Sequence, residues 1–254
     1  MDATIAEVAP LSARGPAPPS IADPKSRLSL LPRFEFRFAG VPIAVSTRSQ
    51  RLIALLAVER TQLRRAFVAG TLWPEAGTNQ AGASLRSALW MIPTQLTAFI
   101  LADGPHIQLA PHLPVDYHVA QATARRLIDS ESEVDAAVDD DLLAADLLPE
   151  WCEDWIIIEQ ERFRQLRLHA LESLCERLTA RRQFARAVQA GLAAVSGEPL
   201  RDSAHRVLIR AHAAEGNQFE AIRQYRRYEH LLREELDLQP SREMRELLDT
   251  LTRN

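Results

Sequence analysis

The residues best suited to binding chemistry lie in one short stretch, residues 83–90, which reads ASLRSALW. Apolar residues recur there at helical spacing and predict the packed side of a helix: Leu85, Leu89 and Ile92. Other residues are left for another side of the helix: Ser84 and Ser87, with Arg86 and Trp90 at its flank. Small side chains beside one guanidinium are suited to the DNA major groove, because bulk must be low there and arginine reaches phosphates or base edges. An ordinary amphipathic helix has the same pattern and is the alternative interpretation.

Catalytic motifs are not found in the sequence. There is no phosphate-binding Gly-x-x-x-x-Gly-Lys-Ser/Thr loop, no Gly-x-Ser-x-Gly nucleophile turn and no His-Glu-x-x-His zinc motif. Three histidines of predicted helices lack carboxylate or cysteine partners at ligand spacing and are interpreted as core or surface residues: His169, His205 and His212. Cys152 and Cys175 are isolated thiols, which favours a structural role in a reducing compartment. We therefore expect no enzyme, no metal and no cofactor.

The size and composition of the chain are those of a globular protein. Of its 254 residues, 46% are hydrophobic and 25% are charged, so it can bury the cores of two medium domains. Its apolar runs are too short to cross a bilayer, and the first two dozen residues lack the basic and apolar regions of a secretory signal. A cytoplasmic protein without membrane contact is expected. Residues 1–26 are rich in Ala, Pro and Ser without periodicity, which predicts a disordered tail.

The segments ahead of residues 83–90 must position that helix. Phe34, Phe36 and Phe38 alternate with charged residues, and a second alternating run follows Gly40. This period of two predicts a small antiparallel sheet over residues 28–45.

Two helices are predicted after this sheet. Thr47 and Gln50 have the spacing of a capping box, which opens a helix that runs to about Glu59. A second helix is expected to begin near Thr61 and to end at Pro74. In the second helix, inward and outward positions are assigned as follows: Leu63, Phe67 and Leu72 inward, Arg64 and Arg65 outward.

The third helix, over residues 79–92, contains the candidate binding face. Thr78 or Asn79 is expected to cap it, and Pro93 to end or kink it. Trp90 is interpreted as a packing residue, because a buried indole stabilises a helix whether or not DNA is bound. The Asp103-Gly104 turn between two short apolar runs predicts a hairpin. A sheet, three helices and a hairpin occur in the order of a winged helix, an α+β domain placed at residues 27–116.

The two halves of the chain differ in the sign of their charge. Residues 25–115 contain ten Lys/Arg and four Asp/Glu, whereas residues 116–254 contain nineteen and twenty-seven. Residues 127–161 alone contain thirteen acidic residues and no basic one. A basic unit joined to an acidic one indicates a part that faces nucleic acid and a part that faces protein, although solvated surface charge explains moderate imbalances equally well.

The second half predicts a helical repeat. Ala187-Val188 and Ala221-Ile222 are each preceded by a polar break, and the two pairs are 34 residues apart. This is the period of tetratricopeptide repeats, in which helix pairs stack and bury a shared face. Unrelated helical hairpins that happen to align are the alternative. Trp151 and Trp155 interrupt two helical patterns before the repeat and are expected to anchor a junction.

Several motifs resemble the bacterial antibiotic regulatory protein family of transcriptional activators. In the first half, they are residues 51–57 (RLIALLA), 72–75 (LWPE), 83–90 and 109–116, of which ASLRSALW is the most specific. In the second half, residues 161–172, 198–206, 208–212 and 221–225 resemble the bacterial transcriptional activator domain of the same family. The resemblance covers about residues 28–253.

This resemblance implies specific roles. The third helix would enter the major groove, with Arg86 and Ser87 as the leading DNA contacts and Ser84 as a further one, and the hairpin near residues 103–108 would lie against the DNA backbone. The helical domain would support self-association and contact with RNA polymerase. Family members usually continue the third helix with basic residues, whereas this chain reads Met91-Ile92-Pro93. Compensating phosphate contacts are expected from other arginines: Arg48, Arg51, Arg64 and Arg65.

The sequence therefore predicts a mainly α protein in which a winged helix is followed by an all-α, tetratricopeptide-like domain at residues 117–254. The expected function is a transcriptional regulator that binds double-stranded DNA as a homodimer on promoter direct repeats and contacts RNA polymerase. A helical-repeat adaptor for protein partners, with a degenerate winged helix, is the alternative.

Overall fold

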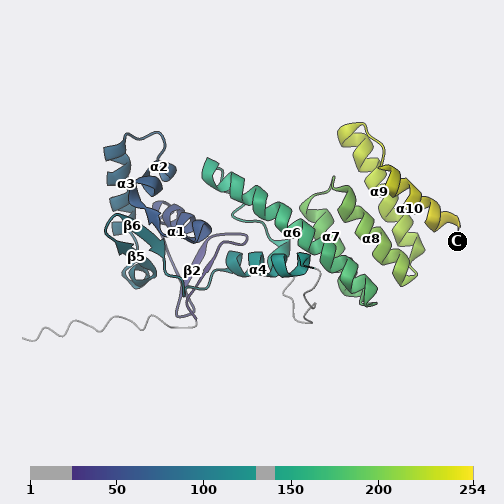
Figure 1. The fold of residues 1–254 in the computed structure, drawn as a ribbon, viewed down its shortest axis with the longest axis horizontal. Helices are drawn as coiled ribbons and strands as arrows, with labels where there is room; N and C mark the ends of the chain where they lie inside the picture. Colours follow the sequence, from purple (N-terminus) through teal and green to yellow (C-terminus); the bar gives the residue numbers. More distant parts are fainter. Residues whose placement is uncertain (1–24, 130–140, 254) are drawn as a thin grey trace, which may run out of the picture.

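The computed structural model describes residues 25–129 and 141–253. Small sheets and short helices form the N-terminal part, and stacked helices form the rest (Figure 1). The expected fold class, a mainly α protein with an α+β part first, is confirmed. The predicted disordered tail lies mostly outside the described residues. Its last position, Ser26, is instead buried, and Ser26 Oγ accepts a hydrogen bond from the Ala39 backbone N–H at 3.1 Å.

The expected N-terminal sheet is present as three antiparallel strands in the order β1-β2-β3: β1 (Arg27–Ser29), β2 (Glu35–Phe38) and β3 (Val41–Ile43). Phe36 at its centre pairs with Leu28 on one side and Ile43 on the other. The Phe36 ring is buried and lies 5.6 Å from that of Phe99, measured between centroids. The alternation of phenylalanines thus places one face of this sheet against the core.

Helix α1 spans Thr47–Glu59, so its N-cap lies one residue before the one predicted. Ser46, not Thr47, is the N-cap, and its Oγ accepts a hydrogen bond from the Ser49 backbone N–H at 3.3 Å. Gln50 Nε2 donates to the Val45 carbonyl, because the chain entering the helix turns back over it. The middle of α1 is buried all round over residues 52–57, so this helix is the centre of the first half.

The predicted helix from Thr61 is shorter than expected. Residues Leu63–Arg64 form strand β4, and α2 spans only Arg65–Leu72. Leu63 pairs with Ile107 in a second sheet, so sheet pairing prevails over the local helical pattern. The rotation of α2 consequently differs from the prediction: Val68 and Leu72 are buried, whereas Phe67 is 50% exposed and not inward.

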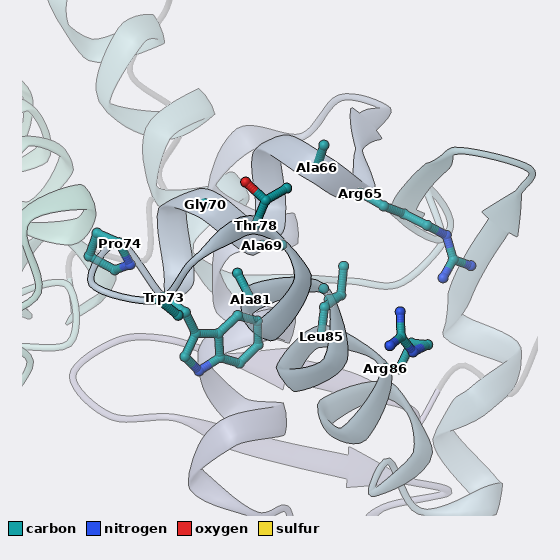
Figure 2. Close-up of a pocket in the computed structure, with 12 residues that line it drawn as sticks. Arg65, Ala66, Ala69, Gly70, Trp73, Pro74, Thr78, Ala81, Leu85 and Arg86 are labelled. Atoms are coloured by element: carbon teal, nitrogen blue, oxygen red, sulfur yellow. The ribbon is translucent and has the colours of Figure 1, made fainter.

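Helix α3 spans Thr78–Trp90 and contains the ASLRSALW stretch of residues 83–90. Its N-cap is Gly77, without a side-chain hydrogen bond, so neither Thr78 nor Asn79 caps it. Ala81 and Leu85 are buried on the side that faces α2 (Figure 2), and Ser49 Oγ of α1 donates to the Ala88 carbonyl at 2.8 Å.

The chain after α3 forms the predicted hairpin. Helix α3 ends before Pro93, as expected, and a 3-10 helix, η1 (Thr94–Phe99), leads into β5 (Ile100–Asp103) and β6 (His106–Leu109). The second sheet has the order β4-β6-β5 and is antiparallel. The expected winged-helix order of elements is therefore present.

Seven helices follow in the described part of the second half: α4 (Asp116–Ile128), α5 (Asp141–Ala144), α6 (Asp154–Ala180), α7 (Phe184–Gly197), α8 (Asp202–Glu215), α9 (Gln218–Leu236) and α10 (Arg242–Arg253). Helices α6 to α10 stack in succession (Figure 1). The 34-residue period has a geometric counterpart, because Arg182 and Gly216 both have left-handed backbones before α7 and α9. Ala187 and Ala221, also 34 residues apart, are both fully buried.

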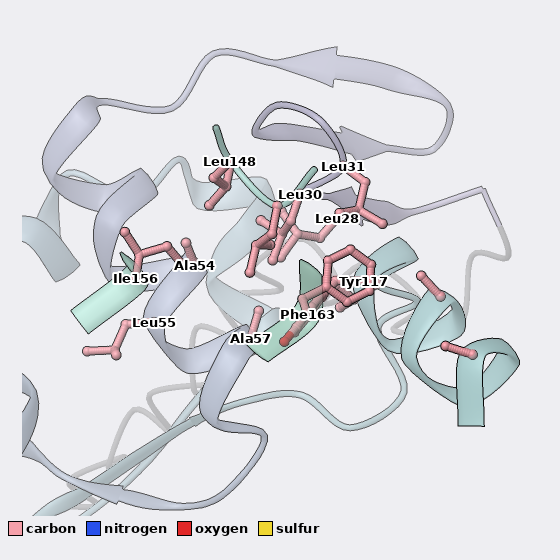
Figure 3. Close-up of a cluster of buried hydrophobic side chains, with 14 of the residues drawn as sticks. Leu28, Leu30, Leu31, Ala54, Leu55, Ala57, Tyr117, Leu148, Ile156 and Phe163 are labelled. Carbon is pink, nitrogen blue, oxygen red and sulfur yellow. The ribbon is translucent and has the colours of Figure 1, made fainter. Parts of the chain in front are cut away.

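One hydrophobic core joins the first half to helices α4 to α8 (Figure 3), and a second cluster joins the end of α8 to α9 and α10. Leu28 and Leu30 of the first sheet region pack in the same cluster as Tyr117 of α4 and Phe163 of α6. Polar contacts fix this junction, since the Asp116 carboxylate accepts hydrogen bonds from the backbone N–H groups of Leu30, at 2.8 Å, and Tyr117, at 2.7 Å.

The junction is closed by residues ahead of and within α6. Trp151 stacks on Phe34 of the first half with ring centroids 6.5 Å apart, and Trp155 meets Trp151 edge-on. The two tryptophans therefore anchor the junction between the halves, whereas the sequence predicted that they anchor a junction between two helical patterns. Tyr117 Oη donates to the Glu159 carboxylate at 2.7 Å, and burial raises the pKa of the Tyr117 hydroxyl.

Candidate nucleic-acid interface

Four exposed residues form a stripe along α3, beside the exposed Thr78 and Gln80 of its first turn. Asn79, Ala83, Arg86 and Trp90 are all exposed, and their spacing of four, three and four residues places them along one side of the helix. The opposite side is fixed to the core by Ala81, Leu85 and Ala88. The stripe is narrow and contains one cation, which suits insertion beside a polyanion.

Trp90 was expected to pack, and that prediction is wrong because its side chain is 87% exposed. Ala88 and Ile92 already fill the core positions at this end of the helix, and Trp90 continues the line of Ala83 and Arg86 instead. The helical phase already placed Trp90 beside Arg86 at the flank of the free side, since residue 90 is four residues after Arg86; the packing role was inferred from the residue type.

The two serines of the candidate site lie at the edges of this stripe. Ser84 and Ser87 are half-buried, whereas Arg86 is exposed. Arg86 folds back along α3, because a Cβ built on Gly82 would lie 3.8 Å from Arg86 Nη1. Of the three candidates on α3, Arg86 is therefore the exposed one.

Three further predicted arginines lie on other elements of the first half. Arg48 is exposed at the first turn of α1, Arg64 is exposed on β4, and Arg65 is half-buried at the start of α2. Across the described ranges, none of these three or Arg86 has an acidic side chain at ion-pair distance. Arg51 differs from them, since its Nε lies 2.7 Å from a carboxylate oxygen of Glu153 and its guanidinium also donates to the Leu72 carbonyl. The Arg51 guanidinium therefore links the two halves of the chain and is not available to bind a DNA phosphate.

The hairpin, α2 and β4 are joined at one corner of the winged helix. The Arg65 backbone N–H donates to the Pro105 carbonyl in the hairpin turn at 2.8 Å, and Arg64 pairs in register with His106 of β6. The start of α2 is thereby held beside the wing. The candidate interface thus consists of the α3 stripe with a basic corner next to it.

No group of three or more His, Cys, Asp or Glu side chains among the described residues is placed to hold a metal ion. No helix in the part that the structure describes is long and apolar enough to span a membrane. Both cysteines are free thiols, Cys152 exposed and Cys175 buried.

The histidines of the repeat region are structural or exposed. His205 is buried and stacks on the Tyr228 ring with centroids 4.1 Å apart. Its Nε2 lies 2.9 Å from the Pro199 carbonyl and its Nδ1 lies 3.0 Å from Gln224 Nε2. The neutral ring satisfies both contacts, because one nitrogen donates and the other accepts. Burial lowers the pKa of His205. His169 is exposed and His212 is half-buried.

Comparison with known proteins gives a domain match and a fold match. Residues 116–251 match the bacterial transcriptional activator domain. A search of curated sequences gives no match. The solved structure of Mycobacterium tuberculosis EmbR in complex with a low-affinity phosphopeptide has a similar fold, with a TM-score of 0.68 and 18% sequence identity. The similarity covers 90% of this chain but 65% of EmbR.

Proposed function

Because the chain belongs to the family of bacterial transcriptional activators defined by this domain, we propose that it is a sequence-specific DNA-binding regulator in which α3 enters the major groove. In this proposal Arg86 reads a base edge or a phosphate, and Ser84 and Ser87 at the edges of the stripe hydrogen-bond to DNA. Arg48, Arg64 and Arg65 contact phosphates on either side.

One observation supports this proposal most directly. The arginines around α3 lack acidic partners in the described part of the chain, and the first half carries an excess of six positive charges, ten against four. Unpaired guanidinium groups that are already held on a rigid scaffold can bind phosphate without first breaking an internal ion pair. Trp90 joins the proposed DNA surface, because its indole follows Arg86 on the same stripe.

The second half is proposed to act on protein. Its repeat helices hold two protomers on promoter direct repeats and contact RNA polymerase, an assignment supported by the family match and by an excess of eight negative charges, twenty-seven against nineteen. Since the DNA targets are chromosomal, the proposed location is the cytoplasm, and no catalytic activity is assigned.

One observation, the early end of α3, favours a second function. The helix stops at Trp90, and Pro93 follows where family members continue with basic residues. A protein-interaction adaptor with a degenerate winged helix would have this feature. The adaptor would bind DNA weakly and without sequence preference.

Selection of genomic DNA fragments by the purified full chain separates the two functions. A regulator enriches a repeated motif, and its affinity for the best fragment falls with rising salt by a log–log slope of about 0.9 per phosphate contact. The spacing of the enriched repeats reports how protomers sit on DNA. Absence of enrichment over competitor DNA would reject the regulator and leave the adaptor.

A further inference from the structure

A pocket with a volume of about 400 Å³ lies between α2 and α3. Its walls are small or apolar, contributed by Ala66, Ala69 and Gly70 of α2 and by Ala81, Gly82 and Leu85 of α3. Trp73 and Pro74 lie at one end, and Arg65 and Arg86 lie on the opposite side (Figure 2). This volume and this mainly apolar lining with a few convergent polar groups are typical of small-molecule sites.

The cationic end of the pocket has no internal counter-charge. No acidic residue lines the pocket, and neither Arg65 nor Arg86 has an ion-pair partner among the described residues. Arg65 Nε is in addition buried without a hydrogen-bond partner. Two guanidinium groups at one site repel each other, and a buried donor without an acceptor is unfavourable. An anion bound between the two guanidinium groups relieves this repulsion.

The apolar end is open to a hydrophobic group. A Cβ built on Gly70 would meet no atom within 4 Å, so the wall of α2 is recessed there. The eight residues of α2 extend about 12 Å at 1.5 Å per residue, which sets the length of the pocket between the two ends. An elongated ligand with one charged end matches this shape better than a compact anion such as phosphate.

We propose that this pocket binds a small amphipathic carboxylate, with its apolar chain between α2 and α3 toward Trp73 and its carboxylate between Arg65 and Arg86. A carboxylate fits the planar donor pattern of guanidinium groups. Removal of the apolar chain from water contributes the remaining affinity.

The same arrangement connects the ligand to DNA binding, a consequence that rests on the proposed function. Arg86 lines the pocket and also belongs to the exposed stripe of α3. A carboxylate that binds Arg86 neutralises its charge and holds the guanidinium away from the groove. The ligand and DNA therefore compete, and each lowers the affinity for the other by the same factor.

Calorimetric titration of the full chain with octanoate, in the absence of DNA, tests the site itself. Saturable binding of one octanoate is expected. Arg65→Gln, which removes the charge, and Gly70→Leu, which fills the recess, should each weaken it about tenfold or more. Arg48→Gln is the matched control, since Arg48 is an exposed arginine outside the pocket, and it should bind octanoate like the wild type.

Three results would overturn the site: no octanoate binding, binding that survives both pocket variants, or equal affinity for the uncharged analogue octan-1-ol. Thermal melting of each variant confirms that a loss of binding is not a loss of folding. Gly70→Leu is informative here, because it adds a side chain in open space and leaves both arginines in place.

A second titration tests the competition with the best DNA fragment from the genomic selection. Saturating octanoate should weaken DNA binding by the wild type and leave that of Gly70→Leu unchanged. Octanoate binding by a chain that binds no DNA would refute the proposed function and leave the pocket supported. DNA binding without octanoate binding would refute the pocket and leave the proposed function supported.

Discussion

The winged-helix half and the helical half differ in how their arginines are paired. In the helical half, many arginines form ion pairs with acids three or four residues away or on another segment: Arg162, Arg164, Arg167, Arg201, Arg206, Arg223, Arg242 and Arg253. Others, such as Arg125, Arg210 and Arg226, have no acid at ion-pair distance among the described residues. The winged-helix half also contains paired arginines, Arg37 with Glu35 and Arg51 with Glu153. In the described part of the winged-helix half, Arg48, Arg64, Arg65 and Arg86 have no such partner. Sequence counts of arginine cannot show this difference, because it depends on what surrounds each side chain.

The difference bears on binding more than on stability. Exposed ion pairs are worth about 0–1 kcal/mol, so the pairs of the helical half contribute little to folding but cancel its local positive charge. The winged-helix half keeps its positive potential, which attracts a polyanion and speeds association. The excess of positive charge in the first half, together with the unpaired arginines beside α3, therefore marks the candidate binding surface.

The largest predicted effect tests whether the two halves fold as one unit. Phe163 of α6 is buried in the core that contains Leu28 and Tyr117. Phe163→Ala should lower the free energy of unfolding by about 3–5 kcal/mol, because a cavity opens in that core. Denaturant unfolding measures the loss, and fluorescence and circular dichroism should report one coincident transition.

Phe219→Ala is the control for this prediction. The Phe219 side chain is 74% exposed, so its removal should change stability by less than about 0.5 kcal/mol. Two separate transitions in either protein would contradict a shared core.

The next effect compares an unpaired arginine with a paired one. Arg86→Ala should weaken DNA binding by about 1–3 kcal/mol, the value of a good arginine contact to a base edge, without loss of folding. Arg223→Ala removes an exposed arginine of α9 that pairs with Glu220 at 3.3 Å and should leave DNA affinity unchanged. Fluorescence anisotropy with labelled DNA measures both. Equal losses of DNA affinity in the two variants would mean that ion pairing does not distinguish arginines that bind DNA from arginines on the solvated surface.

A smaller effect concerns pH and the buried histidine of the helical half. Burial lowers the pKa of His205 in the folded protein, so the unfolded chain takes up a proton at higher pH than the folded one. Titration of His205 therefore lowers the stability of the folded protein as the pH falls through and below 6.5, the ordinary pKa of histidine. His205→Gln should flatten this dependence, so the difference in melting temperature between wild type and variant narrows from pH 7.5 to 5.5. A constant difference would show that His205 does not titrate in this range.

The smallest effect on stability is expected at Trp90. Because its indole is 87% exposed, Trp90→Ala should change the free energy of unfolding by less than about 0.5 kcal/mol. If the indole lies on the DNA surface, DNA affinity falls while the melting temperature stays the same. A large drop in melting temperature would instead restore the packing role that the sequence suggested.

Much of the fold follows from local patterns. The alternation at Phe34, Phe36 and Phe38 predicted the first sheet, and the turn at Gly104 predicted the hairpin. The 34-residue period predicted stacked helices, because a repeat that buries a shared face must recur at a fixed spacing. Pro93 predicted the end of α3, because proline cannot continue a helix.

The predictions from sequence were wrong where contacts between residues far apart in the chain outweighed the local pattern. Leu63 reads as helical but pairs with Ile107, more than forty residues away, and this pairing rotates Phe67 outward. Arg51 reads as one more exposed arginine, but Glu153 of the second half binds it. The candidate residues Ser84, Arg86 and Ser87 were selected by helical phase together with the family resemblance, whereas Trp90 was misplaced because burial was inferred from residue type.

The sequence by itself determined the order of elements, the opposite charges of the two halves and the helix that carries the candidate binding face. These features depend on near neighbours, whose spacing is read directly along the chain. Only the tertiary structure decided which arginines are paired, where Trp90 points and how α2 and α3 enclose a pocket. Those features depend on residues far apart in sequence, which meet only because the hydrophobic core brings their elements together.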